Sequence, residues 1–448
     1  MKNKNKLIIP KKIVTVDKND RILSNTAVEI KDNKINAFIP LNKFERADYE
    51  GEIYDCPGLT LTPGFIQTHV HVCQTLFRGL ADDLQLLDWL QQKIFPFENA
   101  HNKNSLRISA KLGINELLLG GTTTILDMGT LRHQEVVFEE MISSGIRGFS
   151  GKCLLDINEL YSDFKQSTAD ELKYMNELAN EFHSVEEGRI KYGFAPRFVL
   201  SCSEKLLVET KLMMNDFPGS VYHTHSSENK NEIEEVKKKY KKENIDYLNS
   251  INVLDDHTVL AHCIHVNEDE KQILKEKNVR VAHCPSANLK LGSGIANIPE
   301  YLKRGISVSI GADGPPCNNN LSIFTEMRLA ALIQKPLYGA DSMDAKTVFN
   351  IATIEGAKAL YLEDKIGSIE IGKKADILLI NLNCYLNSVS DNDNHIYSDI
   401  VYSSGAQNVN SVMINGRWIV KDGESLVYDK SNLIYSGQRE LKKLLNRL

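Results

Sequence analysis

Two histidines, His69 and His71, stand one residue apart near the end of an apolar run over residues 59–72. Side chains two positions apart in a β-strand lie on the same face, so both imidazoles can bind one metal ion. His225 and Asp313 also follow apolar, strand-like segments. Three ring nitrogens and one carboxylate can thus meet at one point, and the predicted metal ligands are His69, His71, His225 and Asp313.

A set of three imidazoles and one carboxylate suits zinc, with water in an open coordination position. Zinc lowers the pKa of bound water from ~16 towards ~7, which makes hydroxide available at neutral pH. Ferrous iron and manganese take the same kinds of ligand. We therefore expect one divalent metal per chain, Zn²⁺, and the residue types leave Fe²⁺ and Mn²⁺ open.

Hydrolysis by activated water also needs groups that move protons. Asp313 can ligate the metal and accept the proton of the water. Glu228, three residues beyond His225, can carry a proton to a substrate atom. His262, at the end of another apolar segment, can orient the water or stabilise charge as the reaction proceeds. The predicted catalytic residues are Glu228, His262 and Asp313.

The segments that must position these residues form a regular series. Eight short apolar or β-branched runs alternate with helix-length amphipathic stretches between residues 59 and 362. The runs are LTPGFIQTHVHV, TTTILDMG, IRGFSGKCLLD, IKYGFAPRFV, SVYHTHSSE, TVLAHCIHV, VRVAHCPSAN and SVSIGADG. This series predicts an α/β fold, a (β/α)₈ TIM barrel, whose catalytic groups come from the C-terminal ends of the strands. An open, doubly wound sheet would explain the alternation, but it would not gather residues from five strands around one point.

The two ends of the chain have a different character. Residues 1–58 and 366–448 each alternate in a strand-like manner, and neither has enough strands to bury a core alone. We expect both ends to pair into one small composite β-sandwich. The predicted domains are therefore 1–58 (N-terminal part of the sandwich), 59–365 (barrel) and 366–448 (C-terminal part of the sandwich).

Composition narrows the class of protein. A net charge of −6, with 42% hydrophobic and 25% charged residues, gives no reason to expect a nucleic acid or a membrane as partner. No segment approaches the ~20 apolar residues of a membrane span, and the first residues lack the apolar core of a signal peptide. Eight scattered cysteines without a C-x-x-C pair indicate buried thiols in a reducing compartment. We expect a cytoplasmic protein that binds a small heterocyclic molecule, and the sequence leaves a homo-oligomer open.

Long motifs connect the chain to a known family. They are PGFIQTHVH, HCPSANLKLGSGIAN, GADGPPCNNNLSIFTEMRLA and IGSIEIGKKADILLI. With these motifs the sequence resembles the amidohydrolase superfamily, and within it the branch of methylthioadenosine/S-adenosylhomocysteine deaminases, guanine deaminases and s-triazine hydrolases. The resemblance implies the barrel, the companion β-domain and the metal ligands named above. It also implies that Glu228 protonates a ring nitrogen of a heterocycle, while His262 and Asp313 hold the attacking hydroxide. Binuclear relatives carry a modified lysine where the fourth strand here ends in Arg197, so we expect one metal.

Substrate-contacting residues follow mainly from the same resemblance. We expect them to be Gln74, Glu98, Arg197, Lys152 and His283. The counterpart of Glu98 holds ribose hydroxyls in nucleoside deaminases, whereas Gln74 and Arg197 resemble guanine deaminases. A guanidinium fork and an amide can together read the edge of an oxo-purine. Lys152 stands near the place of a carboxylate-binding arginine in relatives that accept S-adenosylhomocysteine.

We predict a metal-dependent aminohydrolase that deaminates an adenosine-type nucleoside: 5′-methylthioadenosine, 5′-deoxyadenosine or S-adenosylhomocysteine. One alternative is a free-base deaminase for guanine or 8-oxoguanine, or an s-triazine hydrolase. Another is a barrel that binds a purine without turning it over. Arg197 can also be a structural ion-pair residue at the barrel rim. The sequence leaves open the roles of His223, His265, Ser286 and Asn288.

Overall fold

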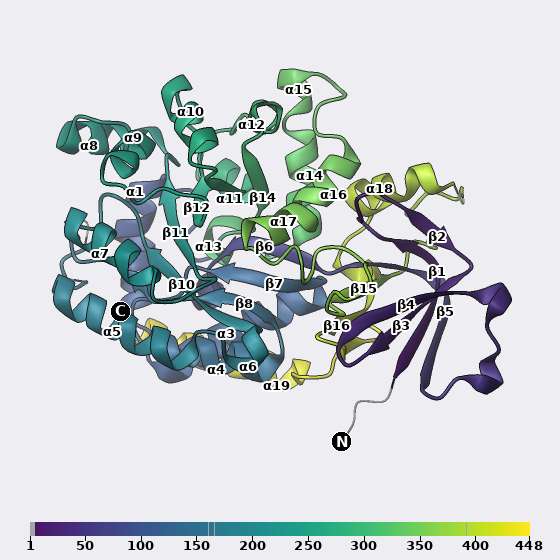
Figure 1. Ribbon diagram of the computed structural model, residues 1–448. Helices are drawn as coiled ribbons and strands as arrows, with labels where there is room; N and C mark the ends of the chain where they lie inside the picture. Colours follow the sequence, from purple (N-terminus) through teal and green to yellow (C-terminus); the bar gives the residue numbers. More distant parts are fainter. Residues whose placement is uncertain (1–4, 160, 165, 391) are drawn as a thin grey trace.

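The computed structural model describes residues 5–159, 161–164, 166–390 and 392–448. Within them, parallel strands follow one another around a barrel in chain order (Figure 1). They are β6 (Phe65–Val70), β7 (Thr122–Asp127), β8 (Arg147–Ser150), β10 (Ile190–Pro196), β11 (Val221–Ser226), β12 (Thr258–His262), β13 (Arg280–His283) and β14 (Ser307–Ile310). A parallel bridge between Val70 and Asp313 links the first strand to the chain after the last. All eight predicted strands are present, and the predicted TIM barrel is confirmed.

Barrel strands are buried on both faces. Every residue of β6 and β7 is buried, and those of β13 and β14 are buried except for the first residue of each. Parallel strands covered by helices on the outside and packed side chains on the inside are expected to read as nearly continuous apolar runs. This is why the sequence pattern identifies them so well. A two-residue strand, β9 (Cys153–Leu154), pairs with the end of β10.

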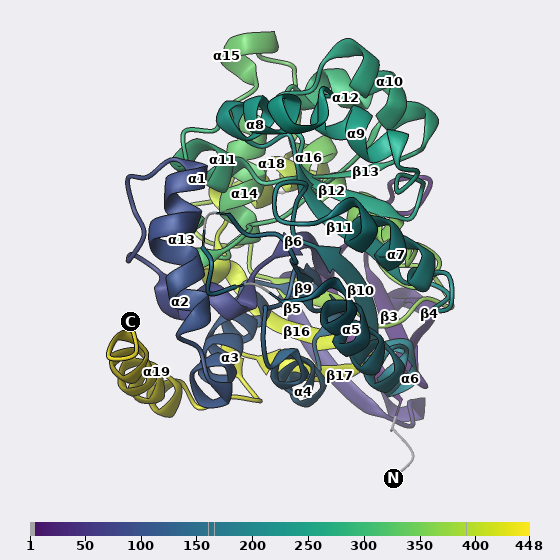
Figure 2. The same ribbon diagram turned by 90° about the vertical axis from the view of Figure 1, so that its left-hand side faces the viewer.

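Helices surround the barrel and fill the loops at its two ends (Figures 1 and 2). Those before β11 are α1 (Leu86–Trp89), α2 (Phe95–Asn99), α3 (Lys103–Leu119), α4 (Gln134–Ser144), α5 (Thr168–Phe182), α6 (Val185–Gly188) and α7 (Glu204–Met214). Those after β11 are α8 (Lys230–Tyr240), α9 (Asn244–Ser250), α10 (Glu268–Glu276), α11 (Pro285–Lys290), α12 (Ile298–Arg304), α13 (Pro315–Asn318), α14 (Ile323–Leu332), α15 (Lys335–Tyr338), α16 (Ala345–Ile351) and α17 (Ile354–Ala359).

The small domain is one mixed sheet built from both ends of the chain. Its described strands are β1 (Lys6–Val14), β2 (Ile22–Ser24), β3 (Thr26–Lys31), β4 (Lys34–Pro40), β5 (Glu52–Pro63), β15 (Ile377–Ile380), β16 (Val409–Ile414), β17 (Arg417–Lys421) and β18 (Glu424–Ser425). The two ends meet where β5 pairs antiparallel with β15, with Leu61 opposite Leu379. The predicted joining of the chain ends in one small β-domain is confirmed.

The sheet coils on itself to enclose a core. The backbone N–H of Ile35 donates to the carbonyl of Lys373, and that of Ala375 donates to the carbonyl of Asn33, both at 2.9 Å. Ile8, Ile35 and Met413 come from distant parts of the sheet and share one buried cluster. The strands therefore close as a sandwich does, although they form one continuous sheet.

An ion pair and a helix connect the small domain to the barrel. Arg147, the first residue of β8, donates from Nε and Nη2 to Asp376 at 2.6 and 3.0 Å, and both side chains are buried. Helix α19 (Lys430–Leu445) leaves the small domain and lies against α3, where Leu444 joins an apolar cluster with Phe77 and Phe97 (Figure 2). The domain boundaries at residues 58 and 365 stay a prediction; β5 runs across the first of them.

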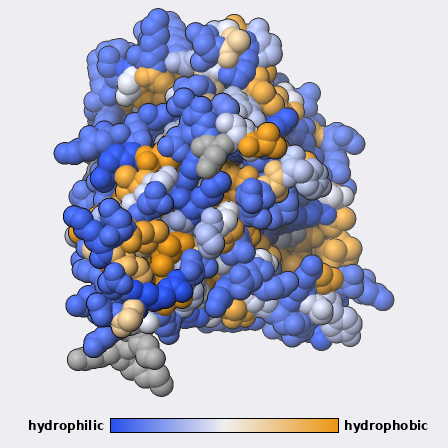
Figure 3. Space-filling model, turned by 90° about the vertical axis from the view of Figure 1, so that its right-hand side faces the viewer, coloured by the Kyte–Doolittle hydropathy of each residue, from blue (hydrophilic) through white to orange (hydrophobic). Residues whose placement is uncertain are grey.

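The face formed by the small domain is mostly hydrophilic, with separate hydrophobic patches (Figure 3). All eight cysteines lie among the described residues and are free thiols. In the described part of the chain, four short helical pieces, among them α18 (Ile396–Ser398), lie between β15 and β16. Within the described part of the chain, no helix has both the length and the apolar character of a membrane span.

Candidate active site

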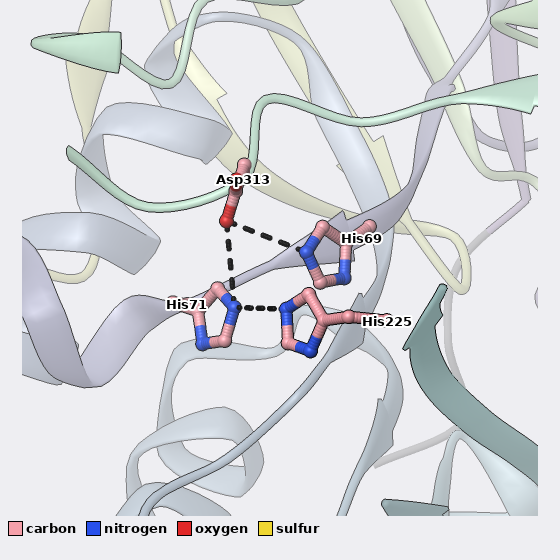
Figure 4. Close-up of side chains that lie close together, drawn as sticks. All are labelled: His69, His71, His225 and Asp313. Atoms are coloured by element: carbon pink, nitrogen blue, oxygen red, sulfur yellow. Dashed lines mark hydrogen bonds and ion pairs between the residues drawn. The ribbon is translucent and has the colours of Figure 1, made fainter. Parts of the chain in front are cut away.

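The four predicted metal ligands converge at the C-terminal end of the barrel. The possible ligand atoms of His69, His71, His225 and Asp313 all lie within 4.8 Å of one another (Figure 4). Asp313 Oδ1 lies 3.3 Å from His69 Nε2 and 3.4 Å from His71 Nε2. His71 Nε2 lies 3.2 Å from His225 Nε2. The predicted meeting of these four side chains in one metal site is confirmed.

Strand geometry explains how these side chains meet. His69 lies on β6 and His71 directly follows it, so both point into the barrel, and His225 does so from β11. The backbone N–H of Asp313 donates to the carbonyl of His69 at 3.1 Å, which brings the chain after β14 beside β6. Gly311 permits this approach, because a Cβ there would lie 2.4 Å from the same carbonyl oxygen.

Hydrogen bonds on the far side of the rings leave ligand nitrogens available. His225 Nδ1 donates to the carbonyl of Arg197 at 2.7 Å, so its Nε2 carries a lone pair. His69 Nδ1 lies 2.9 Å from His223 Nε2, while its buried Nε2 faces Asp313 Oδ1 at 3.3 Å. Burial lowers the pKa of His69, and it lowers those of His71 and His225 well below the usual value. Neutral imidazoles beside one carboxylate fit a divalent metal ion.

Asp313 is held ready in its ionised form. Burial alone would raise the pKa of this carboxyl, but its hydrogen bond to His69 and the nearby imidazoles of His71 and His262 place it well below its usual range. The backbone of Asp313 has φ of +61° and that of His262 has φ of +73°. Left-handed conformations are uncommon outside glycine and are found at functional sites.

The two other predicted catalytic residues, Glu228 and His262, lie beside the four predicted metal ligands. His262 Nε2 lies 3.5 Å from Glu228 Oε2 and 3.8 Å from Asp313 Oδ2. His262 Nδ1 donates to Asn288 Oδ1 at 2.8 Å, so that Nε2, which faces the carboxylates, is the nitrogen without the hydrogen. Burial, with the charges of Asp313 and Glu232, raises the pKa of Glu228 well above its usual value. Glu228 therefore keeps its proton to a higher pH than an exposed glutamate does.

A narrow pocket opens onto these groups. Its lining contains metal ligands, Glu228 and His262, together with a polar edge and an apolar wall. The lining residues are His71, Gln74, Leu86, Trp89, Leu90, Arg197, Phe198, His225, Glu228, Glu232, His262 and Asp313. Such a mixture of apolar surface and few convergent polar groups is typical of a small-molecule site. Larger hollows on the surface, such as the one beside Lys12 and Asp399, lie on the small domain.

Three predicted substrate contacts form one buried network. Gln74 Nε2 donates to Glu98 Oε1 at 2.8 Å, and Arg197 Nη1 donates to Glu98 Oε2 at 3.0 Å. The guanidinium of Arg197 also lies over the ring of Phe95, 5.0 Å from its centre. Gln74 and Arg197 line the pocket, whereas Glu98 lies behind them. Two alternatives were open for Arg197, a structural ion pair and a contact with the pocket. Arg197 both forms a buried ion pair and lines the pocket.

Two expected substrate contacts do not reach the pocket. Lys152 is fully buried, and its Nζ donates to both carboxylate oxygens of Glu171 at 2.7 and 2.6 Å. Lys152 is therefore a structural ion-pair residue here, away from the lining of the metal pocket. His283 is buried at the end of β13 and is also not among the lining residues. Sequence could not show either outcome, because both depend on which side chains pack beside them.

The residues whose roles stayed open now have defined neighbours. His223 Nε2 lies beside His69 Nδ1, and His223 is not one of the four predicted metal ligands. His265 Nε2 donates to the carbonyl of Ser293 at 2.7 Å. Ser286 Oγ donates to Glu326 at 2.5 Å. Asn288 orients His262. Sequence reasoning missed Glu232 and the apolar wall, whose only signal was their place in the segments that follow barrel strands.

Comparisons with known proteins agree with this geometry. The model of the amidohydrolase family matches residues 60–419. A 5-methylthioadenosine/S-adenosylhomocysteine deaminase of Thermoanaerobacter pseudethanolicus is 33% identical over 97% of this chain and 98% of its own length. A 5′-deoxyadenosine deaminase of Methanosphaera stadtmanae is 35% identical over 88% of this chain and 90% of its own. The crystal structure of an adenosine deaminase from Xanthomonas campestris with bound zinc is 27% identical, with a TM-score of 0.90 over 98% of both chains.

These similarities extend over almost the whole chain and cover the complete barrel. They confirm the resemblance to the superfamily branch that holds these deaminases, and with it a hydrolase of carbon–nitrogen bonds. The chain belongs to the amidohydrolase family.

Proposed function

We propose that this protein is a zinc-dependent aminohydrolase that deaminates adenosine-type nucleosides, with 5′-methylthioadenosine and 5′-deoxyadenosine as favoured substrates. Relatives at 33% and 35% identity act on such nucleosides by name, and the zinc-bound relative is an adenosine deaminase. The product would be the corresponding inosine-type nucleoside together with ammonia.

The observation that carries the proposal is the position of Glu228 and His262 beside the four predicted metal ligands. A bound divalent metal supplies a Lewis acid that makes water nucleophilic at neutral pH. Glu228, protonated in its buried position, gives its proton to the ring nitrogen next to the amino-bearing carbon. Asp313 accepts a proton from the attacking water and passes it to the departing amino group, which leaves as ammonia. The proton of the hydroxyl that remains on the carbon returns to Glu228. His262, whose Nε2 carries a lone pair and faces both carboxylates, accepts a hydrogen bond from the attacking water and so orients it.

The pocket wall suits a flat heterocycle. Leu86, Trp89, Leu90 and Phe198 give an apolar surface on which a purine ring can lie. Glu98, held by Gln74 and Arg197, would meet ribose hydroxyls at the polar edge, as the resemblance implies. Substrate entry requires these contacts to open, because Glu98 lies behind its two partners.

The ion pair formed by Lys152 indicates which nucleosides are the better substrates. Its ammonium is paired with Glu171 within 2.7 Å and lies away from the pocket lining. A carboxylate on the substrate would therefore find no free lysine at this position. We place S-adenosylhomocysteine below the two nucleosides without an amino acid tail.

One observation favours a second candidate, a free-base deaminase for guanine or 8-oxoguanine. Gln74 Oε1 is buried without a hydrogen-bond partner at the pocket edge, next to the guanidinium of Arg197. An acceptor and a fork of donors together match the edge of an oxo-purine.

Ammonia release by zinc-loaded protein decides between these candidates. The panel is 5′-methylthioadenosine, 5′-deoxyadenosine, S-adenosylhomocysteine, guanine, 8-oxoguanine and melamine, and the metal is varied among zinc, iron(II) and manganese(II). We expect turnover of the first two compounds. Turnover of a free base alone would replace the proposal by its second candidate. A nucleoside that binds metal-loaded protein and stays unchanged would support a binding protein instead.

A further inference from the structure

Glu232, on the first turn of α8, is tied to the backbone that carries Glu228. Its Oε2 accepts the backbone N–H of Glu228 at 2.8 Å and that of Asn229 at 3.2 Å. Its Oε1 accepts a hydrogen bond from Asn244 Nδ2 at the start of α9. Glu232 is 1% exposed and lines the pocket. One carboxylate thus fixes three groups directly behind the proposed proton donor.

A structural role alone would explain part of this arrangement. Asn229 and Glu232 form a capping box, in which each side chain accepts a backbone N–H of the other residue. The same motif starts α10, where Asn267 and Glu270 cap each other and Glu270 also accepts the backbone N–H of Ile245 at 2.9 Å. The capping box at α8 differs in one respect, because it additionally holds the residue before the N-cap, which is Glu228.

The peptide unit between Ser227 and Glu228 is held at both of its polar groups. The carbonyl of Ser227 accepts the backbone N–H groups of Ile264 and His265 at 2.9 and 3.1 Å, and the N–H of Glu228 donates to Glu232. The side chain of Glu228 meets His262 at 3.5 Å, and the residue before Glu228, Ser227, has a left-handed backbone with φ of +53°. A non-glycine residue in that conformation is held only when its neighbours are fixed. The bond from the Glu228 N–H to Glu232 supplies that restraint on the C-terminal side of Ser227.

We propose that Glu232 is a positioning residue, whose carboxylate holds the backbone of Glu228 so that its carboxyl meets the substrate ring nitrogen. This inference rests on the proposed function for its kinetic consequence, but not for its structural one. A misplacement of about 1 Å in a catalytic group can lower a rate by about 100-fold.

Glu232→Ala removes the restraint and Glu232→Gln preserves most of it. The amide introduced by Glu232→Gln keeps one oxygen for the two backbone N–H groups, and Asn244 can turn its unpartnered Oδ1 towards the new NH₂. Glu270→Ala and Glu270→Gln are the matched controls, because they change the same capping motif away from the pocket. We expect Glu232→Ala to lower kcat by about 10- to 100-fold with KM within about threefold and metal content unchanged. Glu232→Gln should restore kcat to within about fivefold of the wild type.

The substrate is whichever panel compound the wild type turns over, so the choice between nucleoside and free base does not affect the test. Amide hydrogen exchange at residues 227–230 gives a second readout without substrate. We expect faster exchange there in Glu232→Ala and no change in Glu270→Ala. A wild type that is silent on the whole panel would count against the proposed function, while exchange would still decide the role of Glu232.

Three results would overturn the inference: unchanged kcat and exchange in Glu232→Ala, an equal loss of kcat in Glu270→Ala, or equal losses in Glu232→Ala and Glu232→Gln. The last would show that the charge matters and not the placement. If Glu232→Ala does not fold, Asn244→Ala removes one of the three hydrogen bonds and keeps the carboxylate. A fall in its kcat of at least about threefold would then support the inference, and an unchanged kcat would overturn it.

Discussion

The carboxyl of Glu228 has one basic side chain within 4 Å among the described residues, the ring of His262. Burial and the neighbouring carboxylates of Asp313 and Glu232 keep its pKa well above the usual value. A carboxyl with a raised pKa is suited to donate a proton, in contrast to Asp313, whose pKa is well below its usual range. Two acids with opposite pKa shifts in one pocket are typical of divided acid and base roles.

Glu228→Gln tests this division directly. The amide has the same shape but cannot give up a proton, so we expect kcat to fall by about 10²- to 10⁴-fold. Metal content, read by elemental analysis, should equal that of the wild type because Glu228 is not a ligand. Retained turnover in a variant that still holds its metal would refute the proton transfer.

The pair Arg197–Glu98 links stability with recognition. Both side chains are buried, and Arg197→Ala would leave the Glu98 carboxylate without its cation. Loss of one partner from a buried ion pair costs about 3–5 kcal/mol. We expect this loss in urea unfolding, together with a raised KM because the pocket edge changes.

Arg147→Ala is the control for that variant, since Arg147 and Asp376 form a buried pair between barrel and small domain. It should lose comparable stability and keep its KM. Equal changes of KM in the two variants would mean that Arg197 acts on the substrate only through the fold.

At the scale of single residues, the sequence could predict the metal ligands but not which side chains form ion pairs. His69, His71, His225 and Asp313 were identifiable because strand alternation and strand ends fix where they point. Lys152 was expected at the substrate, and the structure pairs it with Glu171, which is 19 residues away on α5. Whether the ammonium of Lys152 is free or paired depends on three-dimensional packing, which the spacing of residues in the sequence does not show.

Among the elements, the loops that follow β11 and β12 share one design. Each leads into a helix that begins with an Asn–Glu capping box, at Asn229 and Glu232 for α8 and at Asn267 and Glu270 for α10. In each box the glutamate is nearly inaccessible to solvent. A capping carboxylate so buried contributes to the pH dependence of stability as well as to helix formation.

Glu270 makes that pH dependence measurable. Burial raises its pKa from 4.5 to about 7, so the folded protein holds this proton more tightly than the unfolded chain does. Below pH 4.5 both states are protonated. Between pH 4.5 and about 7 the folded state binds more protons, so its free energy of unfolding falls as pH rises, by about 3 kcal/mol in total. Urea unfolding at about pH 5 and about pH 8 should show this fall, and Glu270→Gln should remove that part of it; equal falls in both proteins would contradict the assignment.

Helix α19 shows where element prediction ended. Residues after 366 were assigned to the small β-domain because their strands alternate clearly, and β15 to β17 confirm that pattern. The last residues instead form a helix whose buried positions, Leu433, Gly437, Glu440 and Leu444, lie four or three apart. This helical period was visible in the sequence, but the face of α3 that it covers was not.

At the scale of the whole molecule, the barrel and the two-ended sheet are the best predicted features. Both follow from patterns repeated over hundreds of residues, so single errors do not matter. Oligomeric state has no comparable pattern and stays a prediction. A metal ion held by His69, His71, His225 and Asp313 would, in contrast, connect β6 and the chain after β14 with β11, and would thereby stabilise the entire fold.

Removal of the metal should therefore lower the melting temperature. A ligand at about 1,000 times its Kd stabilises the state that binds it by about 4 kcal/mol. We expect a chelator to lower Tm by several degrees and added zinc to restore it, as measured by circular dichroism. His71→Ala, which lacks one ligand, should respond less; an equal response in both proteins would place the metal elsewhere.

The pairing of β5 with β15 sets an order in time for synthesis on the ribosome. The strands β1 to β5 emerge first, yet one edge of β5 stays without its partner until more than 300 further residues have been added. An unpaired strand edge is a template for the wrong partner. The barrel is therefore expected to form while that edge of β5 is still unpaired. Chains that stop before β15 are expected to aggregate, even though they already contain every predicted catalytic residue.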